Sequence, residues 1–267
     1  MGTEFRITIS AEDTSGLSLV IRQCFAKVDA LEQSMSDYRA DSELNQLTGS
    51  TDWQEVSPDL YTVLRFSRQL ARRSKGAYDP TVGPLTKLWR RAFRQQQFPE
   101  EEDILAARTQ VQWKDLKTAR KGHIRLRRGG IRLDLGGVAK GYALDVIGRL
   151  LREAGFPAFL IDGGGDLLLG DAPRGQPEGW RINFPGTCVQ RSLRNVAIAT
   201  SGDSYRYLEH EGRRYSHIID PRTGYGLTQR AIITVIGPNA MIADGLASAV
   251  SVTGSTIRGY RGYLGTP

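Results

Sequence analysis

The spacing of hydrophobic residues changes partway along the chain. Up to about residue 110, apolar residues recur every three or four positions, which is typical of amphipathic helices. The longest such pattern covers residues 16–35. A short helix is predicted soon after it, with Asp41 or Ser42 as its N-cap. Three further helices are predicted over residues 57–76, 82–93 and 101–110, the first of them opened by Ser57-Pro58.

Beyond about residue 121, apolar and polar residues mostly alternate, as they also do over the first ten residues, and this pattern is typical of strands. Residues 123–135 alternate on both sides of Gly129-Gly130 and predict a β-hairpin. A helix follows, with an apolar face that begins at Val138 and an end at Gly155. The remaining predicted elements are strands over 158–170, 180–184, 195–200 and 231–237, a hairpin over 205–220 turning at Glu211-Gly212, and a helix over 238–254.

Helices therefore dominate the first half and strands the second, which indicates an α+β fold rather than repeated βαβ units. We expect mixed or antiparallel sheets with packed helices. The 267 residues predict a single domain over 1–267, built from two intimately associated subdomains. The chain is 40% hydrophobic and 24% charged, as soluble globular proteins are. No run of about 18 apolar residues occurs, so no transmembrane segment is predicted.

The chain is basic, with 36 lysine and arginine residues, 29 acidic residues and a net charge of +7. Much of the excess falls between residues 87 and 132. Such charge suits RNA, an anionic lipid surface or a phosphorylated ligand, but a solvated basic face is the simpler interpretation. Aromatic residues are not interleaved with the basic ones, so we predict no nucleic-acid partner. Cys24 and Cys188 form no motif, and Cys24 falls on the apolar face of a predicted helix.

Glycines next to carboxylates are the first sign of chemistry. In "DLGGVAKG", residues 134–141, a glycine pair joins a predicted strand to a helix, where backbone N–H groups can bind a phosphate. A tight turn with close packing explains the same residues equally well. Lys140 lies in the first turn of this helix, where the helix dipole disfavours a cation. We therefore expect Lys140 to face an anion or the solvent.

Two further segments carry candidate ligands. Asp244 and Ser248 are four residues apart in a predicted helix, so their oxygens share one face and suit Mg²⁺. Asp244 is also explained as a helix cap or dipole partner. In "GAYDPTVGPL", residues 76–85, Tyr78 can stack on a planar ligand and Asp79 can hydrogen-bond to it, although a turn after a helix end explains this segment too.

His217 is one of only three histidines, and it precedes the turn "DPRTG" at residues 220–224. Asp220 and Pro221 suit the first turn positions, and Gly224 suits a left-handed exit. A lone histidine here is a structural strand residue by default. The alternative is a proton acceptor, because an unperturbed imidazole has a pKa of about 6.5.

Seven segments, in order, resemble the ApbE family, the FAD:protein FMN transferases. They are "MGTEFRI", "MSDYRADSELNQL", "GAYDPTVGPLTKLW", "LDLGGVAKGYALD", "LIDGGGDLLLG", "ATSGDSYRYLEHEGRRYSHIIDPRTG" and "ADGLASAVSVTG", from Met1 to about Gly254. The resemblance implies binding of FAD and Mg²⁺. It also implies transfer of FMN to a threonine or serine hydroxyl of a partner protein, with release of AMP.

Site residues follow from the resemblance position by position. The flavin-binding positions it implies are Met1, Tyr38, Ala77, Tyr78, Asp79, Asp134, Lys140 and Ile218. The implied metal ligands are the Gly137 carbonyl, Asp244 and Ser248, and the implied catalytic base is His217. Ser248 stands where most relatives have threonine, which keeps the ligand oxygen without the stiff β-branch.

The resemblance also implies a partner and a compartment. The expected acceptor is a flavoprotein subunit of a membrane electron-transfer complex. Relatives are usually exported, so we expect a periplasmic or cell-envelope location, although no leader precedes the first strand and a cytoplasmic location stays open.

Three other functions compete with flavin transfer. One is hydrolysis of FAD to FMN and AMP, with water in place of the acceptor hydroxyl. The others are a non-catalytic flavin carrier and a basic nucleic-acid binder, whose binding would fall steeply with salt.

Overall fold

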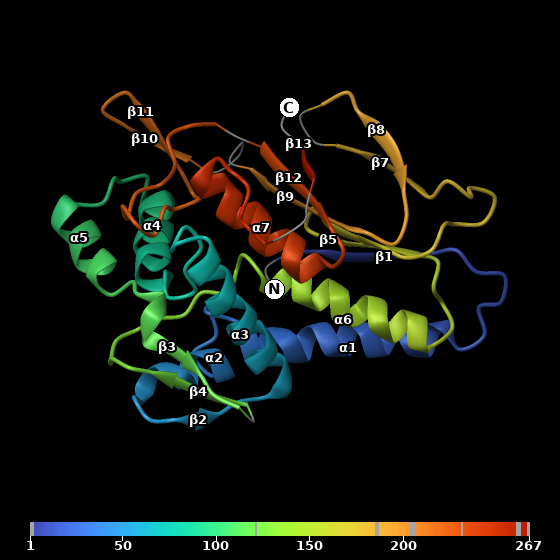
Figure 1. Ribbon diagram of the computed structural model, residues 1–267, viewed down its shortest axis with the longest axis horizontal. Helices are drawn as coiled ribbons and strands as arrows, with labels where there is room; N and C mark the ends of the chain where they lie inside the picture. Colours follow the sequence, from blue (N-terminus) through green and yellow to red (C-terminus); the bar gives the residue numbers. More distant parts are fainter. Residues whose placement is uncertain are drawn as a thin grey trace.

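A six-stranded antiparallel sheet is the centre of the computed structural model of this chain (Figure 1). The structure describes residues 3–120, 122–184, 187–202, 207–230 and 232–259, and the backbone of 263–265. The strand order is β1-β5-β6-β9-β12-β13, and every neighbouring pair is antiparallel. The strands are β1 (Phe5–Ile9), β5 (Phe159–Gly163), β6 (Asp166–Leu169), β9 (Ala197–Gly202), β12 (Ile232–Gly237) and β13 (Tyr263–Gly265).

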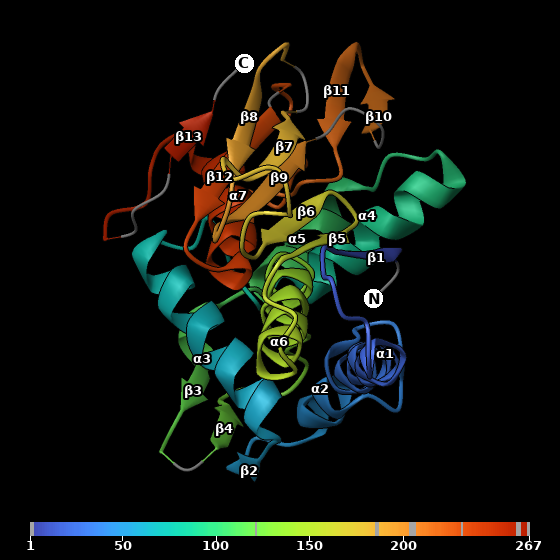
Figure 2. The ribbon, with the colours of Figure 1, turned by 90° about the vertical axis from the view of Figure 1, so that its right-hand side faces the viewer.

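Helices cover one face of this sheet in two layers. α6 (Ala139–Glu153) and α7 (Ala240–Thr253) pack on each other and on the strands. Figure 2 shows α6 flanked by α1 (Leu17–Met35) and α3 (Pro58–Arg73). Apolar faces from all four helices form one continuous core with the sheet. Cys24 is fully buried in that core, which confirms its predicted place.

The contact between α6 and α7 depends on two residues of α6. Asp145 accepts hydrogen bonds from the backbone N–H groups of Ala240 at 2.7 Å and Met241 at 3.0 Å, so it caps the start of α7 together with Asn239. Gly141 has no side chain where the α7 backbone approaches it. A Cβ at this position would lie 2.2 Å from the carbonyl oxygen of Ala240.

Smaller elements surround this centre. The hairpin of β7 (Trp180–Asn183) and β8 (Gln190–Leu193) packs apolar residues against sheet residues such as Leu169 and Ile198. A three-stranded sheet, β2-β4-β3, lies near the N-terminal end of α3. Its strands are β2 (Gln54–Glu55), β3 (Leu116–Thr118) and β4 (His123–Leu126), and α2 (Glu43–Gln46), η1 (Leu47–Gly49) and η2 (Trp113–Asp115) complete this region.

An aromatic cluster joins the last group of elements. α4 (Gly83–Gln95) and α5 (Glu101–Thr109) pack beside the hairpin of β10 (Tyr207–His210) and β11 (Arg213–Ser216). Trp89 of α4 is buried there, with its ring centroid 5.4 Å from Phe98 and 6.0 Å from Tyr215. This cluster fixes α4 relative to the segment that follows β11.

The predicted α+β class and the predicted helices are confirmed. Ser42 and Ser57 are the N-caps, accepting hydrogen bonds from Asn45 N and Leu60 N. The hairpin turn at Glu211-Gly212 is also confirmed, since both residues have positive φ. Within the described residues, no helix has both the length and the apolar character needed to cross a bilayer.

The hairpin predicted over 123–135 is wrong. β4 pairs with β2 and β3, and residues 131–135 belong to no strand. Ile131, Leu133 and Leu135 are nevertheless buried on one side of an extended segment. The N–H of Asp134 donates to the carbonyl of Pro80 at 2.8 Å. Alternation here reflects burial of one side of the chain without a strand partner.

The single strand predicted over 158–170 is also wrong. It is the β5–β6 hairpin, because Gly164 and Gly165 take φ values of 69° and 94° and reverse the chain between Gly163 and Asp166. β8 was not predicted at all. Its side chains are largely exposed, so it carries no alternating hydrophobic pattern.

We expect Gly141→Ala to lower the free energy of unfolding by about 3 kcal/mol, because the new methyl group would meet α7 backbone that cannot move aside. Urea unfolding followed by circular dichroism would measure the loss. Gly49→Ala is the control, since a Cβ there meets nothing within 4 Å and its expected change is below about 0.5 kcal/mol. Similar losses in both variants would contradict the proposed importance of this helix contact.

Candidate active site

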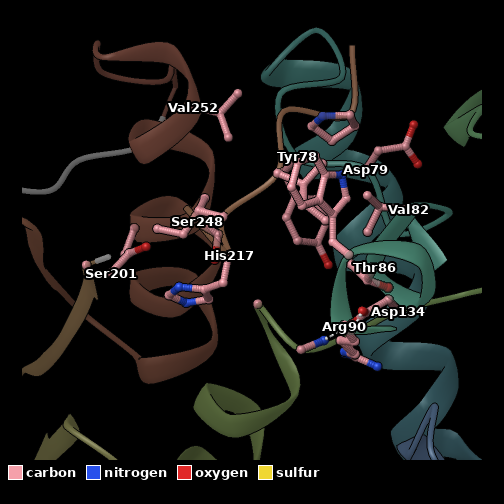
Figure 3. Close-up of a pocket in the computed structure, with 18 of the residues that line it drawn as sticks. Tyr78, Asp79, Val82, Thr86, Arg90, Asp134, Ser201, His217, Ser248 and Val252 are labelled. Atoms are coloured by element: carbon pink, nitrogen blue, oxygen red, sulfur yellow. Dashed lines mark hydrogen bonds and ion pairs between the residues drawn. The ribbon is translucent and has the colours of Figure 1, made fainter. Parts of the chain in front are cut away.

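An open cavity of about 780 Å³ lies between α4 and α7 (Figure 3). The loop before α4 and the turn that begins α6 form further walls, and the end of β9 and the segment after β11 close the rest. The cavity gathers all predicted site residues except one, namely Tyr38, Ala77, Tyr78, Asp79, Asp134, Gly137, Lys140, His217, Ile218, Asp244 and Ser248. Met1 lies outside the described residues.

The loop before α4 is held rigid by Asp79. One carboxylate oxygen, Oδ1, accepts hydrogen bonds from the N–H and the hydroxyl of Thr81, at 2.8 and 2.7 Å. The other, Oδ2, accepts from the N–H of Trp113 at 3.0 Å. In Figure 3 this carboxylate points away from the cavity. Asp79 therefore fixes the shape of the loop, and the predicted direct hydrogen bond from Asp79 to a ligand would need another orientation of its carboxylate.

Tyr78 gives this loop its aromatic surface. Its ring is buried against the cavity wall, and its hydroxyl lies 3.1 Å from the hydroxyl of Ser67. Burial strongly raises the pKa of Tyr78, so the phenol stays neutral over the whole physiological range. A neutral, fixed ring suits contact with the flat face of a ligand.

A charged cluster of Asp37, Arg90 and Asp134 lies at the edge of the cavity, which Arg90 and Asp134 line. Arg90 of α4 forms ion pairs with Asp37 and, at 3.0 Å, with Asp134. Its guanidinium also lies 4.3 Å from the ring centroid of Tyr38, whose side chain is otherwise exposed. Asp134 in turn accepts the N–H of Gly136 at 2.8 Å. One arginine thus fixes both Tyr38 and the turn before α6.

Neither Arg90 nor Asp37 was singled out from the sequence. Arg90 follows a buried tryptophan in an ordinary amphipathic helix, and Asp37 lies 53 residues before it. Burial, and then the nearby charge of Asp134, raise the pKa of Asp37. Only the fold brings the three groups together, so no local pattern could have revealed them.

A second charged cluster joins α6 to α7 and to β6. Lys140 places its Nζ 3.1 Å from Asp166 and 3.3 Å from both carboxylate oxygens of Asp244. The N–H of Gly141 donates to Asp244 at 3.1 Å. The expectation that Lys140 faces an anion is therefore confirmed, and the anions are carboxylates of the chain itself. Asp166 was not assigned to the site from the sequence.

When both carboxylates are ionised, this cluster holds more negative than positive charge. The side chains of Asp166 and Asp244 are only 5% and 6% exposed, and Lys140 is the one cation that contacts them in the described structure. Burial, and then the charge of Asp244, raise the pKa of Asp166 to about 7. The unbalanced carboxylate favours binding of a cation beside Asp244.

The predicted metal ligands fit a hard divalent cation. Gly137 lies so close to Ser248 that a Cβ on Gly137 would be 2.6 Å from the serine hydroxyl oxygen, which brings backbone and hydroxyl donors together beside Asp244. Oxygen donors of this mixed kind suit Mg²⁺. Within the described residues, no three histidine, cysteine or carboxylate side chains gather as a metal site. A metal here would therefore rely on the Asp244 carboxylate together with backbone, hydroxyl and solvent oxygens.

His217 lies at the point where the β10–β11 hairpin meets the cavity. The N–H of Ile218 donates to the Ser216 hydroxyl at 3.0 Å, which fixes the segment just after β11. The turn predicted at 220–224 is present, with Gly224 at a φ of 89°. The carbonyl of Gly224 accepts the indole N–H of Trp89 at 2.8 Å. This bond joins the turn to α4, so His217 is held relative to the opposite wall.

Sequence comparison identifies relatives over almost the entire chain. A sequence model of the ApbE family matches residues 1–259. The FAD:protein FMN transferase of Vibrio cholerae is 35% identical over 95% of this chain and 79% of its own length. The FAD:protein FMN transferase of Escherichia coli K12 is 30% identical over 95% of this chain and 76% of its own length.

Solved structures of flavin transferases are also similar to this chain. The chain is similar to a histidine-to-glycine variant of the flavin transferase ApbE from Vibrio cholerae, with a TM-score of 0.82 and 30% identity, covering 99% of this chain and 94% of that one. It is also similar to the apo flavinyl transferase ApbE of Pseudomonas stutzeri, with a TM-score of 0.80 and 27% identity, covering 94% and 84% of the two chains.

We expect Arg90→Met to lower the free energy of unfolding by about 1–2 kcal/mol, because Asp37 and Asp134 would face each other without a cation in a partly exposed site. Arg91→Met is the control. Arg91 is exposed and pairs only with exposed Asp103, so its expected loss is below about 0.5 kcal/mol.

The loss in Arg90→Met should also depend on pH. The pKa of Asp37 is higher in the folded than in the unfolded protein, so ionisation of Asp37 costs stability. That cost is absent below about pH 4, the unfolded pKa, and grows as pH rises toward the folded pKa. Removal of Arg90 raises the folded pKa further, so the deficit should be larger at about pH 7.5 than at about pH 5. A deficit independent of pH would contradict this electrostatic explanation.

Proposed function

This chain belongs to the ApbE family, and from that premise we propose that it is an FAD:protein FMN transferase that requires Mg²⁺. It would transfer the FMN half of FAD to a threonine or serine hydroxyl of an acceptor flavoprotein and release AMP. The observation that supports this most directly is the shared cavity. His217, the Asp244 and Ser248 oxygens and the Tyr78 ring all line one space of about 780 Å³, a size suited to a dinucleotide.

Each wall of the cavity would contact a different part of FAD or the metal. The rigid loop that carries Ala77 and Tyr78 would contact the flavin ring, with Tyr38 held at the edge of the cavity by Arg90. The turn before α6 would approach the pyrophosphate, because Gly136 and Gly137 leave its backbone uncovered. Gly137, Asp244 and Ser248 would hold the metal, and Mg²⁺, when bound, would neutralise charge on the phosphate oxygens.

His217 would supply the proton transfer that the reaction needs. The acceptor hydroxyl is a weak nucleophile until its proton is removed, and an imidazole can take that proton near neutral pH. The hydroxyl oxygen would then form a bond to the phosphorus atom beside riboflavin. The bond from that phosphorus to the bridging oxygen breaks, and the oxygen leaves as part of AMP. The turn anchored by Trp89 keeps His217 in place for this step.

Hydrolysis of FAD uses the same groups, with water as the nucleophile. The two reactions differ only in whether FMN ends on the acceptor or in solution, so chromatography of FMN and AMP with and without acceptor separates them.

Family membership is also the support for an acceptor in a membrane electron-transfer complex and for a periplasmic or cell-envelope location.

We expect His217→Ala to reduce FMN transfer at least about 100-fold, since general base catalysis contributes that much or more. FAD binding, measured by quenching of flavin fluorescence, should change less than about twofold because the other walls are intact. Transfer would be measured as added FMN mass on an acceptor already shown to be competent with another transferase. His123→Ala, in β4 outside the cavity, is the matched control. Unchanged transfer in His217→Ala would remove His217 from the mechanism.

Ser248→Ala tests the metal site. We expect the Mg²⁺ concentration for half-maximal activity to rise about tenfold, because one oxygen donor is lost, whereas Ser248→Thr should stay near the parent value. Ser251→Ala is the control, because it changes the same residue type in the same helix, α7. Its hydroxyl donates to the Ala247 carbonyl at 2.9 Å and does not line the cavity. An equal rise in both alanine variants would show that Ser248 has no specific role.

A further inference from the structure

A second groove, of about 600 Å³, lies beside α3 and outside the flavin cavity. We call it the basic groove. α3 forms one side, and η2, β3 and the turn after β4 form the other. Six cationic side chains line it, namely Arg68, Arg72, Lys114, Lys117, Arg127 and Arg128. Arg68 and Arg72 are four residues apart in α3 and so share one helix face.

The basic groove has one carboxylate, and that group is already paired. Asp115 lines the groove and lies 2.5 Å from Nε of Arg128. Across the described parts of the chain, none of the other five cationic groups has a carboxylate partner. Lys114 lies 5.9 Å from the ring centroid of Trp113, a contact that does not cancel its charge. Several like charges in one concave surface raise the local positive potential and favour an anion there.

Arg68 adds an independent observation. Its Nε is buried and has no hydrogen-bond acceptor in the structure. A buried N–H without an acceptor costs stability, and such atoms are rare in folded proteins unless a water or ligand serves them. The Nε itself has no accessible surface, so a ligand in the groove would meet the terminal nitrogens of this guanidinium, and a phosphate provides acceptor oxygens that match their planar donor pattern.

We propose that the basic groove binds a phosphate group carrying two or more negative charges. The site goes beyond the proposed function, since it shares no lining residue with the flavin cavity. The phosphate can belong to a small soluble anion, such as a pyrophosphate or a nucleotide, or to a lipid headgroup. Both sources present the same chemistry to Arg68 and Lys117.

The two sites are nevertheless in contact through one loop. Gln112 and Trp113 line the basic groove, and their N–H groups donate to the Thr81 hydroxyl at 2.8 Å and to Asp79 at 3.0 Å. Thr81 and Asp79 belong to the loop that carries Tyr78 into the flavin cavity. An anion in the basic groove would therefore bind against the far side of this loop.

Calorimetric titration with pyrophosphate tests the small-anion form. The full chain is saturated with FAD in buffer containing a metal chelator, so that the flavin cavity is filled and inactive. Arg68→Met should weaken pyrophosphate binding about tenfold or more, because a charge-assisted hydrogen bond is lost. Arg65→Met is the control, since Arg65 lies one turn earlier on α3 and does not line the groove, and it should change binding less than about twofold.

A loss of folding in Arg68→Met is not expected to explain weaker pyrophosphate binding. Methionine retains most of the arginine's apolar length and removes the buried donor that lacks an acceptor, so Arg68→Met should unfold at the same or a higher temperature without ligand. Pyrophosphate should raise the unfolding temperature of the parent chain and of Arg65→Met more than that of Arg68→Met.

Vesicle sedimentation tests the lipid form. Vesicles of phosphatidylcholine with phosphatidic acid are compared with vesicles of phosphatidylcholine alone. Binding only to the acidic vesicles, weakened by Arg68→Met and by Lys117→Met but not by Arg65→Met, would assign the groove to a lipid phosphate. The proposal is overturned if neither probe binds, if FAD competes with pyrophosphate, or if Arg65→Met and Arg68→Met weaken binding equally.

Discussion

The close contact between α6 and α7 is the constraint on which the rest of the site depends. Asp145 caps α7 from α6, and Gly141 allows the α7 backbone to approach. The same contact brings Lys140 against Asp244 and places the Gly141 N–H on that carboxylate. The structural interface between the two helices and the charged cluster are therefore one set of atoms. A sequence that loosened the packing would also separate the charges, and "GGVAKGYALD" accordingly carries Lys140 and Asp145 among small residues.

The sequence predicted the local features of the fold well and the long-range ones poorly. Ser57 and Gly155 were identified, and Ser42 was one of two N-cap candidates, because helix ends are determined by residues within one turn. The hairpin predicted over 123–135 was wrong because alternation shows which side is buried but not which strand is the partner. The β5–β6 turn was missed since three consecutive glycines do not reveal which two of them reverse the chain.

In the candidate site, too, the local features could be predicted from the sequence and the long-range ones could not. The family resemblance located eleven residues that line one cavity, although their roles stay predictions. It did not locate Arg90, Asp37 or Asp166, whose importance arises only from neighbours distant in the chain. Lys140 is the informative case, because its poor local position, a cation in the first turn of a helix, indicated an anion or the solvent as its neighbour, and the fold supplies two carboxylates.

The separation of Lys140 and Asp244 by 104 residues also has a consequence in time. A ribosome adds about 5–20 residues each second, and domains fold as their segments emerge. α1, α3 and α6 can begin to pack while α7 is still unsynthesised, and Lys140 then has Asp166 as a carboxylate partner but not Asp244. During synthesis the half-built cavity therefore holds an incomplete charge cluster until α7 arrives. The full set of charges in the cluster is then acquired in one late step, when α7 packs against α6.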